Sequence, residues 1–125
     1  MSADSAPNAH DDEGRKTGWW SESDPHGGRI TGEYVEGERH GLWRHYFTDG
    51  SLRSEGEYHR GKLHGGWVWY RATGGLLQRG GFLDDEKHGL WERWNAEGVP
   101  LDTTQWDRGK KLRASRSSAS QQQDR

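Results

Sequence analysis

The chain has 125 residues, enough for one ordinary domain, and a formal net charge of −2. Only 28% of the residues are hydrophobic and few are aliphatic, which argues against a two-layer aliphatic core, whereas 8 Trp, 4 Tyr and 2 Phe supply a large aromatic content. The absence of Cys excludes a disulfide scaffold and a Cys-based metal site. We therefore expect an aromatic core and, with 19 Gly, many turns or backbone passing beneath large rings.

Residues 1–16 are polar and acidic, with Asp4, Asp11, Asp12 and Glu13 among them. They contain no apolar segment of the kind that a secretory signal needs. We expect a disordered N-terminal tail over residues 1–16 and a cytoplasmic location. No run of about 18 apolar residues occurs anywhere, so the sequence predicts no membrane-spanning helix.

From residue 17 to residue 111 the sequence repeats with a period of 24 residues. The repeated positions are His40, His64 and His88; Gly41, Gly65 and Gly89; Trp43, Trp67 and Trp91; Tyr46, Tyr70 and Trp94; Gly50, Gly74 and Gly98; Gly32, Gly56 and Gly80; and Tyr34, Tyr58, Phe82 and Trp106. Columns that stay in phase over several units indicate a repeat architecture. The pattern predicts units near residues 17–34, 35–58, 59–82 and 83–111, followed by a disordered basic and polar tail over residues 112–125.

Each unit is predicted to be a β-hairpin. Asp49-Gly50, and the equivalent X-Gly pairs of the next two units, lie midway between two β-prone runs, as the residues of a two-residue primed turn would. Counting outward from this turn pairs Phe47 with Leu52, Tyr46 with Arg53, Arg44 with Glu55 and Trp43 with Gly56. We therefore predict an all-β fold, an elongated single-layer antiparallel sheet of about four consecutive hairpins.

The same count divides the side chains between two faces. The first face is predicted to hold Trp43, Phe47, Leu52, Gly56 and Tyr58, then Trp67, Leu76, Gly80 and Phe82, then Trp91 and Trp106. Gly56 and Gly80 would then lie beneath a Trp ring that leaves no room for a side chain. The second face would hold Tyr46, Tyr70 and Trp94, with Arg53, Leu77 and Leu101 opposite them. This second row either stabilises the sheet, by about 0.2–1 kcal/mol per cross-strand pair, or forms a contact strip for a partner.

The segment from Gly32 to Trp43 reads Gly-Glu-Tyr-X-X-Gly-X-X-His-Gly-Leu-Trp, and the segment from Gly56 to Trp67 repeats it with one substitution. The third copy, from Gly80 to Trp91, has Asp85 in place of the middle Gly. Over residues 28–111 the pattern resembles the MORN-type repeat, in particular the bacterial variant grouped as YwqK-type antitoxin components of toxin–antitoxin systems. The resemblance implies an elongated single-layer antiparallel sheet and a role in interaction.

No motif predicts catalysis, a cofactor or a metal. The residues of the His40, His64 and His88 column would lie roughly 9.6 Å apart on successive hairpins, too far to share one ion, since ligands lie about 2 Å from a zinc. We expect each of them to order its own turn. The chain has no Cys nucleophile, no His-Glu-X-X-His and no phosphate-binding loop, and Asp84-Asp85-Glu86 is expected to form a solvated turn between hairpins.

The first functional hypothesis is a protein-binding module, which the resemblance makes an antitoxin or immunity protein that blocks a toxin sterically. The residues predicted to contact the partner are Tyr46, Tyr70, Trp94, Arg44, Glu55, Arg79 and Glu92.

Two alternatives remain open. One is attachment to anionic lipid, which would use Arg60, Lys62, Lys87, Arg108, Lys110 and Lys111. The other is a structural element, monomeric or weakly self-associating, that stacks end to end through unpaired strand edges. No nucleic-acid partner is expected, because the basic C-terminal stretch has no aromatic residues interleaved with its charges.

Overall fold

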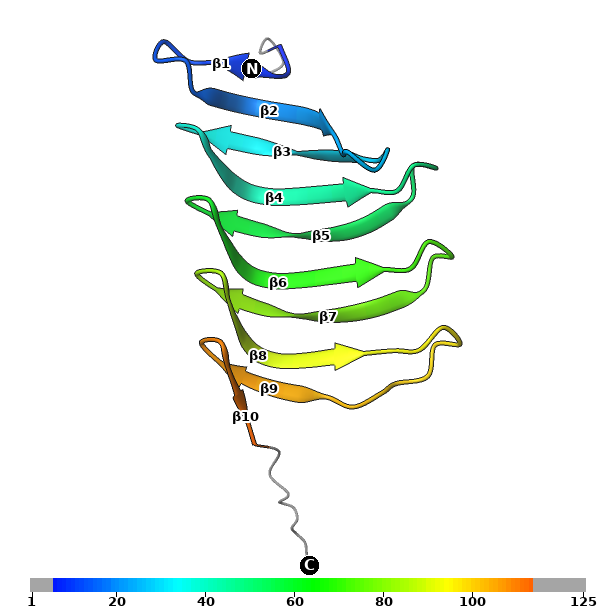
Figure 1. Cartoon of the computed structure of the whole chain (residues 1–125). Coiled ribbons are helices and arrows are strands. Elements are labelled where there is room, and N and C mark those ends of the chain that lie inside the picture. Colours follow the sequence, from blue (N-terminus) through cyan, green and yellow to red (C-terminus); the bar gives the residue numbers. More distant parts are fainter. Residues whose placement is uncertain (1–5, 114–125) are drawn as a thin grey trace, which may run out of the picture.

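The structure, a computed structural model, describes residues 6–113. They form one open sheet of ten strands, in which each strand pairs antiparallel with its neighbours in sequence (Figure 1). The strands are β1 (Ala9–His10), β2 (Lys16–Ser23), β3 (Arg29–Val35), β4 (Glu38–Tyr46), β5 (Leu52–His59), β6 (Lys62–Tyr70), β7 (Leu76–Leu83), β8 (Glu86–Arg93), β9 (Thr104–Asp107) and β10 (Lys110–Leu112).

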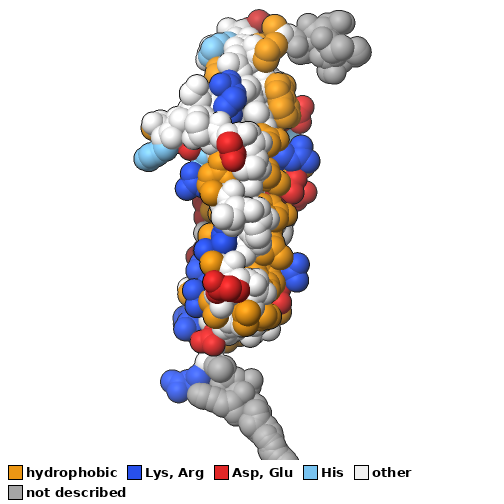
Figure 2. Space-filling view, turned by 90° about the vertical axis from the view of Figure 1, so that its right-hand side faces the viewer, with side chains coloured by type: hydrophobic (Ala, Val, Ile, Leu, Met, Phe, Trp, Pro, Cys, Tyr) orange, Lys and Arg blue, Asp and Glu red, His pale blue; other side chains and the backbone are white. Residues whose placement is uncertain are grey.

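The predicted fold class is confirmed. Consecutive hairpins follow one another along a single sheet, which appears as a narrow slab when it is viewed edge-on (Figure 2). No helix in the described part of the chain is long and apolar enough to cross a bilayer.

The first hairpin lies where the sequence predicted a disordered tail. β1 pairs with the start of β2, His10 opposite Lys16, and the carboxylate of Asp11 accepts hydrogen bonds from the backbone N–H groups of Glu13 and Arg15 at 2.9 Å each. The acidic residues of this segment therefore build a turn, so the prediction of disorder is wrong for residues 6–16. At the other end β10 reaches Leu112, and the rest of the expected tail, from residue 114, lies outside the described residues, as do residues 1–5.

One face of the sheet, the tryptophan face, carries the core. Its buried rings are Trp20, Trp43, Trp67 and Trp91, one from each even-numbered strand from β2 to β8, together with Tyr34. They alternate with the rings of the intervening strands in the order Trp20, Tyr34, Trp43, Tyr58, Trp67, Phe82 and Trp91. Successive centroids lie between 5.1 Å and 6.3 Å apart and every contact is edge-to-face, the geometry that aromatic quadrupoles favour.

Glycine lies beneath each Trp of the central hairpins. Trp67 lies across Gly56 and Trp91 across Gly80, and a Cβ atom added to either glycine would overlap the indole, 1.9 Å and 2.0 Å from its nearest ring atom. Gly32 has the same relation to Trp43. This is the arrangement expected for Gly56 and Gly80, and it explains why one column of the repeat tolerates no side chain.

Each of these indoles also donates a hydrogen bond to the backbone at a β-bulge. The Nε1 of Trp67 donates to the carbonyl oxygen of Glu57 at 3.1 Å, and the register between β5 and β6 shifts at Gly56/Glu57. Equivalent bonds join Trp43 to Glu33 and Trp91 to Gly81, both at 3.0 Å. The bulge thus leaves a carbonyl free of the ladder, and the indole satisfies it.

The two edges of the sheet use different turns. At one edge Glu36-Gly37, Arg60-Gly61, Asp84-Asp85 and Arg108-Gly109 form two-residue turns with positive φ at both positions, as type I′ turns require. The backbone N–H of the second turn residue donates to a carbonyl oxygen of the preceding hairpin. Gly61 N donates to Arg39 O at 3.0 Å, and Gly109 N donates to Lys87 O at 2.7 Å. These bonds stack successive hairpins in register at this edge.

At the other edge the predicted two-residue turn is wrong. Gly50 N donates to Phe47 O at 2.9 Å and Phe47 N to Ser51 O at 2.8 Å, so the loop has three residues, the last a Gly at φ 92°. A second bulge, in addition to the one at which each indole donates, follows this loop in the ladder between β4 and β5. There Tyr46 pairs with Leu52.

The second bulge changes the predicted faces beyond it. Arg53 does not oppose Tyr46; it lies 3.9 Å from Asp24 of the neighbouring turn. Leu52 pairs with Tyr46 instead of joining the face of Trp43. In the same way Tyr70 pairs with Leu76, and not with Leu77. The extra residue of a bulge shifts the alternation by one position, which a count from the turn alone does not detect.

Candidate binding face

The face opposite the tryptophans, which we call the leucine face, leaves apolar side chains exposed. Trp19 is 48% exposed, Leu42 43% and Leu90 45%, and each follows a glycine with positive φ, namely Gly18, Gly41 and Gly89. Gly18, Gly41, Gly65 and Gly89 pair with equivalent aromatic residues of the next strand, so the residues after them form one column. That column reads Trp19, Leu42, Gly66 and Leu90.

Two ion pairs flank this column. Arg44 Nε lies 2.8 Å from Glu55 Oε2, and Arg79 Nε lies 2.8 Å from Glu92 Oε1. The hydrogen bond that Arg44 donates to the Glu55 carboxylate raises the pKa of Arg44 above its ordinary value. Exposed pairs of this kind stabilise a fold by about 0–1 kcal/mol. The structure thus brings together, in pairs, the four charged residues that the sequence predicted as partner contacts.

The predicted aromatic strip lies on the same face. Tyr46, Tyr70 and Trp94 come two residues after Arg44, Val68 and Glu92, and alternation along a strand places them on the same side. All three are half-buried. The guanidinium of Arg79 lies 5.4 Å from the Trp94 ring centroid, and Trp94 pairs with Pro100, not with the expected Leu101.

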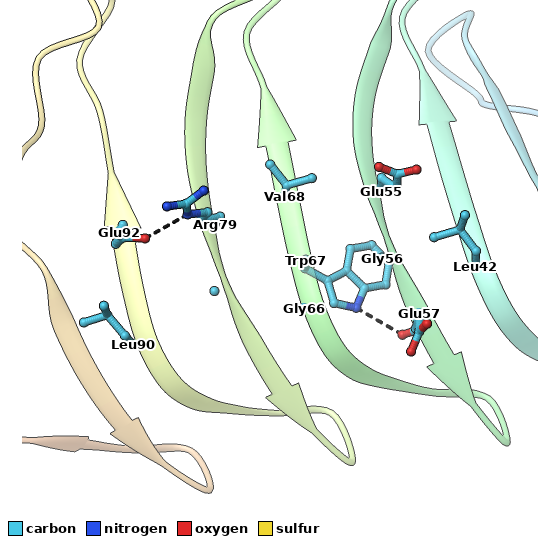
Figure 3. Close-up of a pocket in the computed structure, with 11 residues that line it drawn as sticks. Leu42, Glu55, Gly56, Glu57, Gly66, Trp67, Val68, Arg79, Leu90 and Glu92 are labelled. Atoms are coloured by element: carbon cyan, nitrogen blue, oxygen red, sulfur yellow. Dashed lines mark hydrogen bonds and ion pairs between the residues drawn. The ribbon is translucent and has the colours of Figure 1, made fainter.

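A shallow depression of about 540 Å³ opens in the middle of the leucine face. Figure 3 shows Leu42 and Leu90 on its two sides, with the glycine of β6 between them. Its lining combines apolar and charged groups, namely Leu42, Val68, Leu90, Glu55, Glu57, Arg79 and Glu92, with the backbone of Gly66. Gly56, Gly80 and Trp67 also line it, and the ring of Trp67 lies across Gly56 on the opposite face of the sheet.

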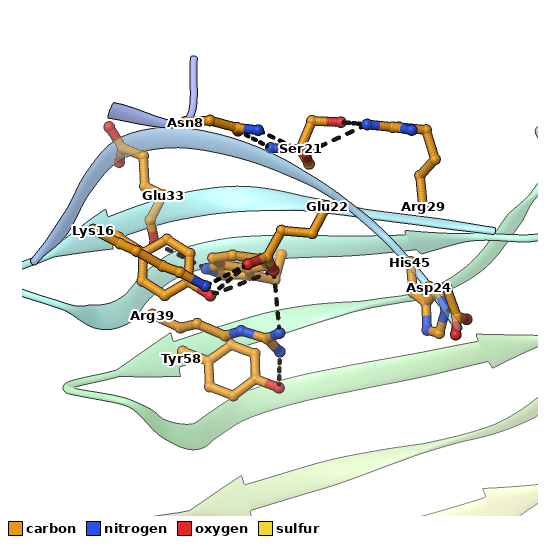
Figure 4. Close-up of polar contacts among 12 residues, drawn as sticks. Asn8, Lys16, Ser21, Glu22, Asp24, Arg29, Glu33, Arg39, His45 and Tyr58 are labelled. Atoms are coloured by element: carbon orange, nitrogen blue, oxygen red, sulfur yellow. Dashed lines mark hydrogen bonds and ion pairs between the residues drawn. The ribbon is translucent and has the colours of Figure 1, made fainter. Parts of the chain in front are cut away.

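The tryptophan face, by contrast, has cations placed over its rings. Lys16 Nζ lies 4.7 Å from the Trp20 centroid, the Arg39 guanidinium 4.4 Å from that of Trp43, and Lys87 Nζ 4.6 Å from that of Trp91. Lys16 also pairs with Glu22 at 2.8 Å (Figure 4), and that hydrogen bond raises the pKa of Lys16. Residues of the chain itself thus make the cation–π contacts of these rings.

At least one histidine of the repeated column orders a turn. No group of His, Asp or Glu within residues 6–113 is arranged to hold an ion. His88 Nδ1 accepts a hydrogen bond from Arg108 N at 3.2 Å, so this His orders the following turn. Asp85 has a similar role, because its Oδ1 accepts from Leu63 N at 2.7 Å.

The basic residues predicted to bind lipid are interleaved with acidic ones. Along the type I′ edge the successive turns carry Glu36 and Glu38, then Arg60 and Lys62, then Asp84, Asp85 and Glu86, then Arg108 and Lys110. Their charges alternate from turn to turn. Lys87 is engaged over the rings of Trp91 and Trp106. The edge is therefore not a uniformly positive surface.

No protein-family model matches this chain, and no curated protein matches it. The sequence reasoning had missed the exposed Leu42 and Leu90, which it treated only as part of a motif. It had also missed Gly66. The signal was present as a broken column, since Gly66 stands where two other units have Leu.

Proposed function

We propose that the chain is a non-catalytic protein-binding module that contacts its partner through the leucine face. The observation that carries this proposal is the difference between the two faces. The tryptophan face packs its own rings and places cations over Trp20, Trp43 and Trp91, whereas the leucine face exposes Trp19, Leu42 and Leu90 in one column. Exposed apolar side chains rimmed by charged groups are typical of interaction surfaces.

The half-buried row of Tyr46, Tyr70 and Trp94 extends the same surface toward the three-residue turns. Aromatic residues and Arg dominate the binding energy of protein interfaces, and both occur here beside the leucines. A single rigid sheet presents these groups with little ordering cost on binding, which favours affinity.

The partner class that we propose is a protein toxin, neutralised sterically in the cytoplasm. This part of the proposal rests on the resemblance of the Gly-Glu-Tyr and His-Gly-Leu-Trp segments to the YwqK-type variant of the MORN repeat. The hairpin-repeat sheet is compatible with it.

Co-expression with the product of the neighbouring gene tests the proposal. We expect the neighbouring product to be toxic alone, to be tolerated with this chain, and to co-purify with it. The double variant Leu42→Asp/Leu90→Asp should lose both effects. Val99→Asp is the matched control, because Val99 is 52% exposed in the connection after β8, away from the column. If the neighbouring product is harmless and does not co-purify with this chain, the proposal of a toxin partner is wrong. If both variants lose the two effects equally, the proposal that the leucine face makes the contact is wrong.

Anionic lipid is the alternative ligand. The alternating charges of the type I′ edge argue against it, because acidic turns lie between the basic ones. Sedimentation with anionic liposomes at low and high salt decides the matter, since binding through Lys and Arg weakens sharply with salt. If the chain co-sediments with the liposomes in a salt-sensitive way, the proposed protein partner is wrong and the ligand is a membrane surface.

A further inference from the structure

Two repeat columns are interrupted at the centre of the leucine face. The column of Trp19, Leu42 and Leu90 has Gly66 at the β6 position. In the neighbouring strand the equivalent cross-strand partners are Glu33, Glu57 and Gln105, and the position opposite Gly66 is Gly81. Two side chains are thus missing at one cross-strand pair, and we call this gap the glycine notch (Gly66 and Gly81).

Neither the backbone conformation nor the surroundings of Gly66 require a glycine. Its φ lies outside the left-handed range, and a Cβ atom added to it would meet no heavy atom within 4 Å. The adjacent Gly65 differs, because its φ is +71°, and Gly81 differs, because a Cβ there would lie 2.8 Å from the carbonyl oxygen of His88. A strand-interior Gly costs about 0.5–1 kcal/mol relative to Ala. Gly66 lies in the bulge between β5 and β6, but Leu42 and Leu90 occupy the same position in the equivalent bulges, so the bulge needs no glycine. Besides bulges and bends, a strand glycine marks a place where a ligand or another backbone approaches closely.

The walls of the notch define what fits into it. Leu42 and Leu90 belong to strands four positions apart, roughly 19 Å across the sheet, and glycines line the depression between them. The exposed Leu42 and Leu90, with Val68, give it apolar walls that suit a large apolar or aromatic side chain. The notch lies mid-sheet, away from both ends of the described chain.

The charges at the rim add a second requirement. Glu55 and Glu92 are paired with Arg44 and Arg79, whereas Glu57 is exposed and makes no ion pair with any residue in the described range. The rim therefore has one uncompensated negative charge beside the notch. A cation carried by the occupant would complement it.

We propose that the glycine notch receives a large apolar side chain from a peptide segment of the partner protein, and that a Lys or Arg next to it in that segment pairs with Glu57. This inference rests on the proposed function, which it makes specific. The partner's side chain would fill the space left at Gly66 and Gly81, in line with Leu42 and Leu90. The segment would run across the strands, along the depression.

A phage-displayed library of random peptides, panned on the full chain, tests the inference. The decisive variant is Gly66→Leu, which restores the residue of the flanking units and leaves the fold intact, as far-UV circular dichroism should verify. We expect selected peptides to pair an apolar residue with a nearby Lys or Arg and to bind Gly66→Leu at least about tenfold more weakly, as expected for blocking an interface anchor. Gly75→Leu is the matched control, because that turn glycine also has open space around it and no positive φ.

Further results separate the inference from the proposed function. Glu57→Gln should weaken the same peptides and reduce their salt dependence, and the amide signals of Gly66 and Gly81 should shift when peptide is added to labelled protein. Peptides that lose binding in Leu42→Asp/Leu90→Asp but not in Gly66→Leu or Glu57→Gln would overturn the notch and keep the binding face. Selection of no peptide above background, or of peptides insensitive to all of these variants, would overturn both. If the chain dimerises with increasing concentration and Gly66→Leu abolishes the dimer, the occupant of the notch is a second copy of the chain and the proposed peptide segment is wrong.

Discussion

Replacing Trp67 by Ala should cost more stability than any exposed aromatic can. The indole is 8% exposed, contacts the rings of Tyr58 and Phe82 edge-to-face, and donates its Nε1–H to the Glu57 carbonyl at 3.1 Å. Truncation of a buried Trp costs about 3–5 kcal/mol, a large part of the roughly 5–15 kcal/mol that a domain has available. The matched control is Trp19→Ala, whose ring is 48% exposed and whose loss should cost about 0.5 kcal/mol or less.

The glycine beneath the ring turns this prediction into a double-mutant cycle. Gly56→Ala alone should cost about 1–3 kcal/mol, because its Cβ would enter the Trp67 ring. In the Trp67→Ala background the clash is absent, and the same change should be neutral or stabilise the strand by about 0.5 kcal/mol. We therefore expect a coupling energy of about 2 kcal/mol between the two positions.

Urea unfolding followed by far-UV circular dichroism measures all four members of the cycle. The change in the free energy of unfolding should be largest for Trp67→Ala and should depend on the Gly56 background. If Trp67→Ala cost no more than Trp19→Ala, or if the effects of the Trp67 and Gly56 changes were additive, the packing of indole on bare backbone would not be what holds the hairpins together.

Two further predictions concern backbone conformation and pH. Gly41→Ala should lower the melting temperature, at a cost of about 1–2 kcal/mol, because φ is +73° there; Gly66→Ala should not lower it, although both sites have open space around them. Equal calorimetric shifts would contradict this reasoning. The backbone N–H of His26 and the side chain of His45 hold the pKa of Asp24 below its ordinary value of 3.8. Its contribution to stability is thus complete above the unfolded pKa and is lost as the pH falls through the lower folded pKa, so the urea midpoint of the wild type should fall below about pH 4 more steeply than that of Asp24→Asn; parallel curves would exclude Asp24 as the cause.

Turn position and strand alternation were enough to predict the architecture, because each repeat unit contains the same signals. Trp67 over Gly56 and Arg44 opposite Glu55 both follow from strand alternation counted from a turn near residue 50. The count survived an error in the turn, since the three-residue loop and the bulge beside Tyr46 compensate each other before residue 55 is reached.

The remaining features depend on contacts between hairpins, which a period cannot show. Arg53 reaches Asp24 only because a bulge turns it to the tryptophan face. Trp69, absent from every predicted row, stacks between Trp67 and Trp91 at 5.9 Å and 5.5 Å. Gly66 was visible as a departure from the repeat, but its meaning required knowing that nothing lies above it.

The bonds that join each type I′ turn to the preceding hairpin have a consequence for how such a chain can change in length. Gly61 reaches Arg39 and Gly109 reaches Lys87 across one unit, and within residues 6–113 no such bond spans two. Duplicating or deleting one internal segment of 24 residues would therefore recreate every junction already present, and would lengthen or shorten the sheet by roughly 9.6 Å, two strand spacings, without new complementarity. Gene duplication in frame could thus adjust the length of the proposed binding face while the rest of the chain stays as it is.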